Sequence, residues 1–200
     1  MASFGLILFA LVHFAAAGVR VPRQFDAAVP LTHDSPRSNS VAICKLVSSA
    51  GHNVTGDVVF RQGNENDPVE ITGVISGLSP GYHGFHVHQN SNLSDNCKAA
   101  GSHFNPDQVQ HGAPYDSIRH AGDLGNIPAD ENGFSTFQFL DKQISLMDNH
   151  PQQILGRAIV LHAKEDDLGR GRNDESKKTG NAGARVACCV IEPVNRYYSS

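Results

Sequence analysis

Short apolar segments alternate with turn-forming residues along most of the chain. Within each segment hydrophobic and polar positions tend to alternate, and Gly, Pro, Asn or Asp closes the segment. This period of two predicts half-buried β-strands, and a series of short strands with turns between them predicts a β-sandwich or a closed barrel. Eight strands are predicted, over residues 41–47, 54–62, 69–76, 81–88, 123–127, 134–140, 154–163 and 184–192.

Two connections between these strands are much longer than a turn. Residues 89–122 are rich in Gly, Asn, Pro and Ser and show no apolar period, whereas residues 164–183 carry charges of both signs together with glycine. Loops of this length inside a compact domain usually serve a function. We expect the first to be an ordered binding loop. For the second, a plain solvated loop is the alternative.

The chain divides into one domain and three flanking segments. Residues 1–17 contain an apolar run of about 14 residues that closes in small side chains, which predicts a secretory signal peptide; the run is too short to span a bilayer comfortably. No other stretch is apolar enough to span one. Residues 18–40 predict a flexible N-terminal arm, residues 41–194 the folded domain, and residues 195–200 a polar C-terminal tail.

Composition fits a small secreted domain. Two hundred residues with 40% hydrophobic content can bury one core, and 19 glycines and 10 prolines favour a turn-rich, all-β chain. A net charge of -4 provides no general basic surface, which argues against nucleic acid as a partner. Four cysteines suit an oxidising compartment. The sequons at Asn53 and Asn92 are candidate glycosylation sites on a secreted chain.

Histidines concentrate in one part of the chain. Residues two apart in a strand lie on the same face, roughly 6.7 Å from one another, so His86 and His88 can converge on one ion. His83 has the other parity in the same strand, and we interpret it as structural. Six of the 11 histidines fall within 38 residues, followed by an aspartate: His83, His86, His88, His103, His111, His120 and Asp123.

The second half of this stretch has the composition of a zinc site. His103, His111, His120 and Asp123 offer three imidazoles and one carboxylate, which suit a closed tetrahedral zinc site. A copper-like imidazole cluster is therefore predicted beside a zinc-like site. His162 lies in the predicted strand 154–163, where its local sequence fits a buried core histidine equally well.

Six segments of the chain are specific when they are taken together: GFHVH (84–88), GSHFNP (101–106), HGAP (111–114), RHAGDLGN (119–126), GRAIVLHAKEDDLG (156–169) and TGNAGARVAC (179–188). Through these segments, the chain from about residue 41 to residue 192 resembles secreted copper/zinc superoxide dismutase. The resemblance implies an eight-stranded Greek-key flattened barrel, an immunoglobulin-like sandwich with two long functional loops. It also implies dismutation of superoxide to oxygen and hydrogen peroxide through alternate reduction and reoxidation of copper, in protection against extracellular oxidative stress.

The resemblance assigns metal ligands residue by residue. One Cu(2+)/Cu(+) and one Zn(2+) are implied for each subunit, with one histidine bridging them as an imidazolate. Secretion, superoxide as the substrate and a homodimer are implied as well. The implied copper ligands are His86, His88, His103 and His162, and the implied zinc ligands are His103, His111, His120 and Asp123.

Other residues acquire roles in the same way. Arg185 resembles the active-site guanidinium that acts with His103, and Lys178 and Thr179 resemble the rim of the substrate channel. Asp166 resembles the carboxylate that links histidines of the two metal sites. Cys97 and Cys188 resemble the disulfide of each subunit in the family.

The chain also departs from the family pattern. Residues 89–92 replace an acidic residue and a Gly-Asp pair, and residues 150–153 lengthen a region that the family uses for dimer contact. Cys189 replaces a glycine; since strand neighbours point to opposite faces, a bond between Cys188 and Cys189 is disfavoured. A Cys44–Cys189 bond is the weaker hypothesis, with two buried free thiols as its alternative.

Overall fold

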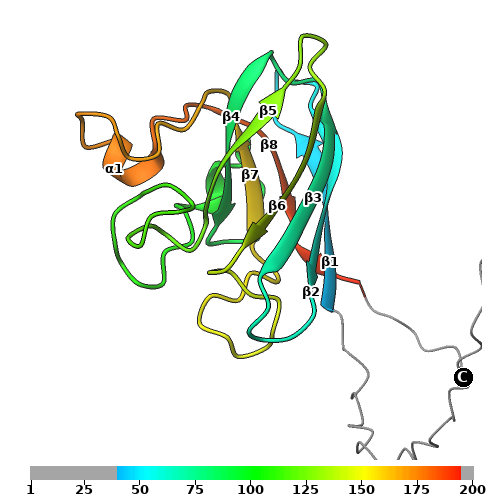
Figure 1. Cartoon of the computed structure of the whole chain (residues 1–200). Coiled ribbons are helices and arrows are strands. Elements are labelled where there is room, and N and C mark those ends of the chain that lie inside the picture. The colour runs from blue at the N-terminus through cyan, green and yellow to red at the C-terminus, as the bar shows by residue number, and fades with distance from the viewer. Residues whose placement is uncertain (1–39, 195–200) are drawn as a thin grey trace, which may run out of the picture. The chain divides into compact units, whose positions relative to one another are not determined.

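The computed structural model describes residues 40–194. The predicted signal peptide, residues 18–39 of the predicted arm and the predicted tail lie outside the described residues. Nearly all regular structure is strand (Figure 1). The strands are β1 (Ser40–Ser48), β2 (Thr55–Gln62), β3 (Val69–Ser76), β4 (Gly81–His88), β5 (Asp123–Ala129), β6 (Ser135–Asp141), β7 (Ala158–His162), β8 (Arg185–Val190) and β9 (Glu192–Pro193).

The strands form an antiparallel, nearly closed barrel. Their order is β5-β4-β7-β8-β1-β2-β3-β6, and the short β9 pairs with β1. β4 therefore neighbours β7, and β3 neighbours β6, which are the crossovers of a Greek key. β1 pairs with β2 through residues 40–46 and with β8 through residues 47–48, so this one strand joins the two halves. The predicted all-β barrel is confirmed.

Three local predictions need correction. The strand predicted over 154–163 begins only at Ala158, because Gly156 has a φ of 75° and the residues before it form a turn. The strand predicted over 184–192 ends at Val190, and the chain then turns to pair with β1 as β9. Each long loop, predicted to lack regular structure, also contains one short helical turn: η1 (Lys98–Ala100) in the first and α1 (Ser176–Thr179) in the second. Neither segment has a helical apolar period in the sequence.

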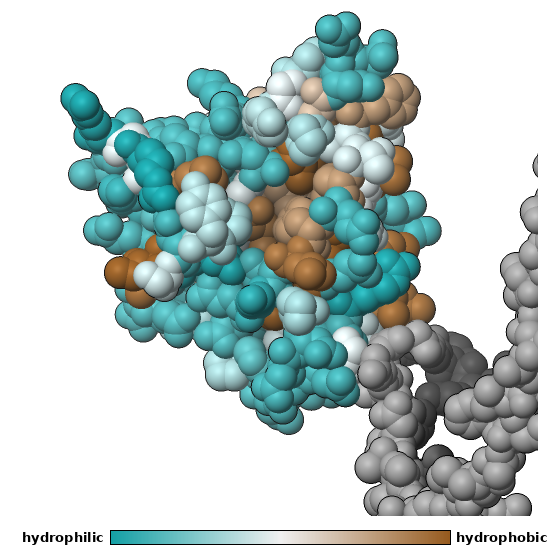
Figure 2. Space-filling model, viewed as in Figure 1, coloured by the Kyte–Doolittle hydropathy of each residue, from teal (hydrophilic) through white to brown (hydrophobic). Residues whose placement is uncertain are grey.

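Alternate side chains of the strands fill the barrel. In β4, Phe85 and Val87 are fully buried in the core, and the ring of Phe85 lies 5.4 Å from that of Phe137 on β6. Gly73 on β3 pairs with Phe137, and any side chain there would collide with that ring. The intervening positions of β4 point to the opposite side, where the long loops cover them. The face that β3, β5 and β6 turn to the viewer carries scattered apolar residues, whereas the loops beside it are mainly hydrophilic (Figure 2).

Both predicted disulfides are present in the structure. Cys44 on β1 is bonded to Cys189 on β8 across 145 residues, and Cys97 in the first long loop is bonded to Cys188. Cys189 packs in the main core and Cys188 in a second small cluster, so the two neighbours do point to opposite faces. Within residues 40–194 no cysteine is free, and that same part of the chain has no helix long and apolar enough to cross a membrane.

We predict that the Cys44–Cys189 bond stabilises the barrel substantially. Replacing both residues by alanine removes a constraint on the unfolded chain, and unfolding in urea should become easier by about 2–4 kcal/mol. The double variant avoids leaving one thiol beside Cys188. Val47→Ala, at an exposed position of the same strand, is the control and should change little. An unchanged midpoint in the double variant would contradict the prediction.

Candidate metal centre

The barrel wall and the two long loops enclose a group of histidines. His86 and His88 lie on β4, on the side opposite the core residues Phe85 and Val87. His162 ends β7, next to β4, where the pairing of β7 with β8 is irregular. His103 comes from the first long loop and forms an isolated bridge with His88.

Four of these histidines form one donor group. The ligand atoms of His86, His88, His103 and His162 all lie within 4.8 Å of one another, and all four residues are buried. In each of them one ring nitrogen has no hydrogen-bond partner: Nδ1 of His86 and Nε2 of the other three. Unpartnered buried nitrogens are costly unless another group satisfies them. A cluster of imidazole donors fits a copper ion.

The opposite ring nitrogens explain why these atoms are lone-pair donors. His88 Nδ1 lies 2.9 Å from the carbonyl oxygen of Gly101, and His162 Nδ1 lies 3.2 Å from that of Gly183. A carbonyl only accepts, so each of these nitrogens carries the proton and leaves Nε2 deprotonated. The outer hydrogen bond therefore fixes both the tautomer and the direction of the ring.

A second donor group surrounds Asp123, the first residue of β5. Its carboxylate oxygen Oδ1 lies 2.8 Å from Nδ1 of His103, 2.9 Å from Nδ1 of His111 and 3.1 Å from Nδ1 of His120. The His111 nitrogen is close to this oxygen but lacks hydrogen-bond geometry. Three imidazoles and one carboxylate, all buried, fit the closed tetrahedral site of zinc.

His103 is the only residue that belongs to both donor groups. Its Nδ1 faces Asp123, while its buried Nε2 is unpartnered, as expected for an atom directed at the other group. Neither ring nitrogen donates to a backbone carbonyl. This arrangement suits an imidazolate that bridges two ions.

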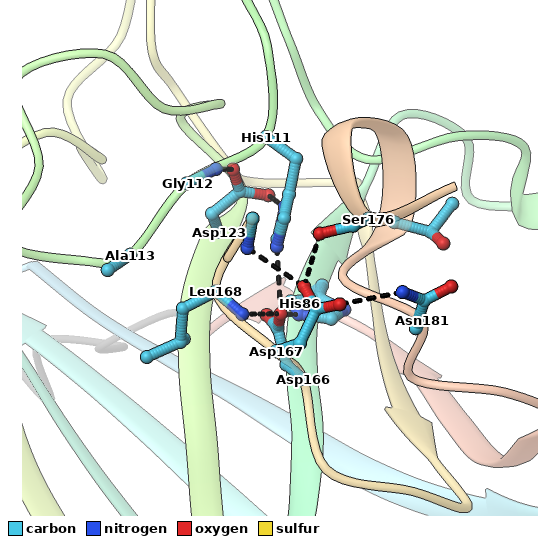
Figure 3. Close-up of polar contacts among 12 residues, drawn as sticks. His86, His111, Gly112, Ala113, Asp123, Asp166, Asp167, Leu168, Ser176 and Asn181 are labelled. Atoms are coloured by element: carbon cyan, nitrogen blue, oxygen red, sulfur yellow. Dashed lines mark hydrogen bonds and ion pairs between the residues drawn. The ribbon is translucent and has the colours of Figure 1, made fainter. Parts of the chain in front are cut away.

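The carboxylate of Asp166 connects the two donor groups by contacting one histidine of each (Figure 3). Its Oδ2 lies 2.8 Å from Nε2 of His86, and its Oδ1 lies 2.8 Å from Nε2 of His111. Asn126 on β5 bonds both the backbone N–H and the carbonyl of Asp166 at 2.8 Å, which holds the carboxylate in place. One carboxylate thus orients a ring of each donor group.

The predicted channel residues lie beside the histidine group. A cavity of about 980 Å³ is lined by His88, His103 and His162 together with Lys178, Thr179 and Arg185. The Arg185 guanidinium donates to the carbonyl oxygens of Cys97 and Gly101, both at 2.6 Å. No carboxylate pairs with it among residues 40–194, so its positive charge stays available to an anion in the cavity.

The environment shifts the pKa of the donor side chains in two directions. Burial, followed by repulsion from neighbouring histidines, holds the pKa of His86 and His88 well below the usual 6.5 and lowers that of His162 to about 3. Burial also disfavours charge on His111, but Asp123 and Asp166 outweigh it and raise the pKa to about 9. Burial would raise the pKa of the Asp123 carboxyl, but its three histidines lower it far below the ordinary value.

Three other residues singled out in the sequence, His83, Asn53 and Asn92, lie outside both donor groups. His83 lies outside both groups, and its ring nitrogens face the carbonyl oxygens of His162 and Ser79, each at 2.8 Å. The sequon residues Asn53 and Asn92 are both exposed. Asn126 was missed by the sequence analysis, because its role depends on a backbone contact 40 residues away.

Two comparisons with known proteins bear on this geometry. The family model described as copper/zinc superoxide dismutase (SODC) matches residues 54–191. The chain is also similar to the crystal structure of the clock protein EA4, with 47% sequence identity and a TM-score of 0.71. That match covers 77% of this chain and 94% of the other.

We predict that the metal-free protein is most stable near neutral pH. Because the pKa values of His86, His88 and His162 are lowered on folding, the unfolded chain binds more protons, and stability falls as pH drops below 6.5. The raised pKa of His111 acts oppositely: its contribution is complete below pH 6.5 and is lost as pH rises through about 9. Calorimetry of chelator-treated protein across this range checks both limbs, and a flat melting temperature would contradict them.

Proposed function

The chain belongs to the copper/zinc superoxide dismutase family, and from this premise we propose how its residues share the work of superoxide dismutation. The enzyme converts two superoxide anions and two protons into oxygen and hydrogen peroxide, one anion being oxidised and the other reduced. The proposal rests on one observation above all. Two buried donor groups of different composition share the ring of His103.

The two donor groups suit different ions. His86, His88, His103 and His162 would hold copper, and His103, His111, His120 and Asp123 would hold zinc, one of each per subunit. Copper supplies the one-electron chemistry when bound, whereas zinc has no redox chemistry. The carboxylate in the second group and the all-imidazole first group support this division.

Arg185 attracts and orients the substrate. Its guanidinium is held by two carbonyls beside the histidines and keeps an unpaired positive charge. A small anion entering the cavity meets Lys178 and Thr179 at the rim and then fixed N–H donors at Arg185. Both features favour an anionic substrate over neutral oxygen or peroxide, which helps the products leave.

His103 is the residue placed to handle a proton. Its Nε2 lies within the first donor group, next to the cavity, and has no hydrogen-bond partner in the protein. A proton taken up at Nε2 during one half of the cycle can pass to the reduced substrate in the other half. Asp123 holds the ring from the Nδ1 side, so the ring keeps its place as its protonation changes.

The proposal includes an extracellular setting. Two disulfides suit an oxidising compartment, and the exposed sequon residues Asn53 and Asn92 could carry glycans there. We infer a signal peptide over residues 1–17, secretion, protection against extracellular oxidative stress, and a homodimer. Secretion is tested by expressing the full chain in animal cells and analysing the medium. The mass before and after glycan removal reports occupancy, and light scattering reports the number of subunits.

The central experiment joins metal analysis to a superoxide assay on the purified mature chain supplied with both ions. Close to one copper and one zinc per subunit, with dismutation that a copper chelator abolishes, is the expected result. Zinc without copper after expression in copper-replete medium would contradict the proposal.

Two histidine variants separate the donor groups. His162 belongs only to the first group, so His162→Ala should lose copper and activity while keeping zinc. His120 belongs only to the second group, so His120→Ala should lose zinc first. Metal content and circular dichroism of both variants check the assignment, and loss of the same ion from both would refute it.

Arg185→Ile should slow turnover roughly 10-fold and weaken its dependence on ionic strength, because a steering charge is lost. Arg61→Gln changes the same charge at an exposed position on β2, away from the cavity, and is the matched control. Rates measured from low to high salt test the prediction. Equal salt dependence in the two variants would show that Arg185 does not steer the substrate.

A further inference from the structure

A buried ion pair lies beside the second donor group without belonging to it. Nη2 of Arg119 lies 2.6 Å from Oδ2 of Asp141, and both side chains are only 4% exposed. Arg119 directly precedes His120 in the first long loop, and Asp141 is the last residue of β6. A charged pair this deep is costly to desolvate, so a purely structural contact would be served as well by apolar side chains.

The guanidinium of Arg119 also holds the backbone of two ligand residues. Its Nη1 donates to the carbonyl oxygen of Asp123 at 2.8 Å, with a longer contact of 3.5 Å to that of His120. The carboxylate of Asp123 accepts in turn from the backbone N–H of His120, at 2.8 Å, and of Gly112, at 3.1 Å. The turn 120–123 is thus fixed from both sides, which aims Oδ1 of Asp123 at the three imidazoles.

Asp141 anchors the other end of the pair to the barrel. Its second oxygen, Oδ1, accepts from the backbone N–H groups of Gln143 at 2.8 Å and Ile144 at 3.0 Å. Ile144 is buried in the main core. Both carboxylate oxygens are therefore used, one by the turn after β6 and one by Arg119. The result is a continuous path from the core, through the carboxylate and the guanidinium, to the carbonyls of the turn 120–123.

We propose that Arg119 and Asp141 are positioning residues for zinc: they set the affinity of the second donor group by fixing the turn 120–123 against the barrel. The inference rests on the proposed assignment of zinc to this group. Arginine suits the role because its planar fork bonds a carboxylate and a backbone carbonyl at the same time, which the single ammonium of lysine does less well. Partners that orient metal ligands are worth roughly 10–100-fold in metal affinity.

The test compares Asp141→Asn and Arg119→Lys with the parent protein. Each variant keeps a side chain of similar size, and Ile71→Val, in the core on β3, provides a matched loss of packing away from the loop. The zinc dissociation constant is measured by chelator competition. The visible spectrum of Co(2+) in the same site reports its geometry, and neither readout depends on activity.

We expect zinc to bind roughly 10–100-fold more weakly in Asp141→Asn, with an altered Co(2+) spectrum. Arg119→Lys should weaken binding less, and Ile71→Val should leave affinity and spectrum unchanged. Affinity within about twofold of the parent in both pair variants, or an equal loss in Ile71→Val, would overturn the proposal. Failure of both pair variants to fold would overturn it too, because the pair would then be needed by the barrel itself.

Asp123→Ala distinguishes this inference from the function on which it rests. If this variant still binds zinc like the parent, the zinc site has been assigned to the wrong residues. If it loses zinc while Asp141→Asn keeps the parental affinity, the site stands and the positioning role is wrong.

Discussion

Within residues 40–194, five histidine ring nitrogens are buried without a hydrogen-bond partner in the protein, and several contacts described above hold their rings in place. They belong to His86, His88, His103, His111 and His162. Leaving a polar group buried and unsatisfied costs roughly 1–3 kcal/mol, and a metal ion bound to these nitrogens would offset that cost. The outer hydrogen bonds of the rings, the shared Asp166 and the two disulfides are the devices that retain the arrangement.

β8 takes part in holding both the barrel and the first long loop. Its adjacent cysteines point to opposite faces: one is bonded to β1 inside the core, and the other to the loop that supplies Cys97. The second bond closes the loop whose carbonyls, at Cys97 and Gly101, receive the Arg185 guanidinium. The disulfides of β8 therefore tie the barrel together on one side and hold the loop that positions the Arg185 guanidinium on the other.

Most of the barrel could be predicted from the alternation of hydrophobic and polar residues, because a strand with one buried face has a hydrophobic residue at every second position. The same parity placed His86 and His88 together and separated His83 from them. The start of β7 was missed because Gly156 takes a left-handed conformation that hydrophobicity does not encode. Backbone partners are invisible in a sequence, which hid the carbonyls behind the rings, and no pattern connects Arg119 with Asp141, 22 residues away.

The single ring shared by both donor groups makes occupancy a collective property of the subunit. By thermodynamic linkage, if one bound ion changes the affinity for the second ion by some factor, the second ion changes the affinity for the first by the same factor. A cation held at one nitrogen of the His103 ring would make the proton on the other nitrogen easier to lose, whereas the charges of the two cations would oppose double loading. The occupancy of each donor group would therefore depend on the concentrations of both ions and not on that of one alone.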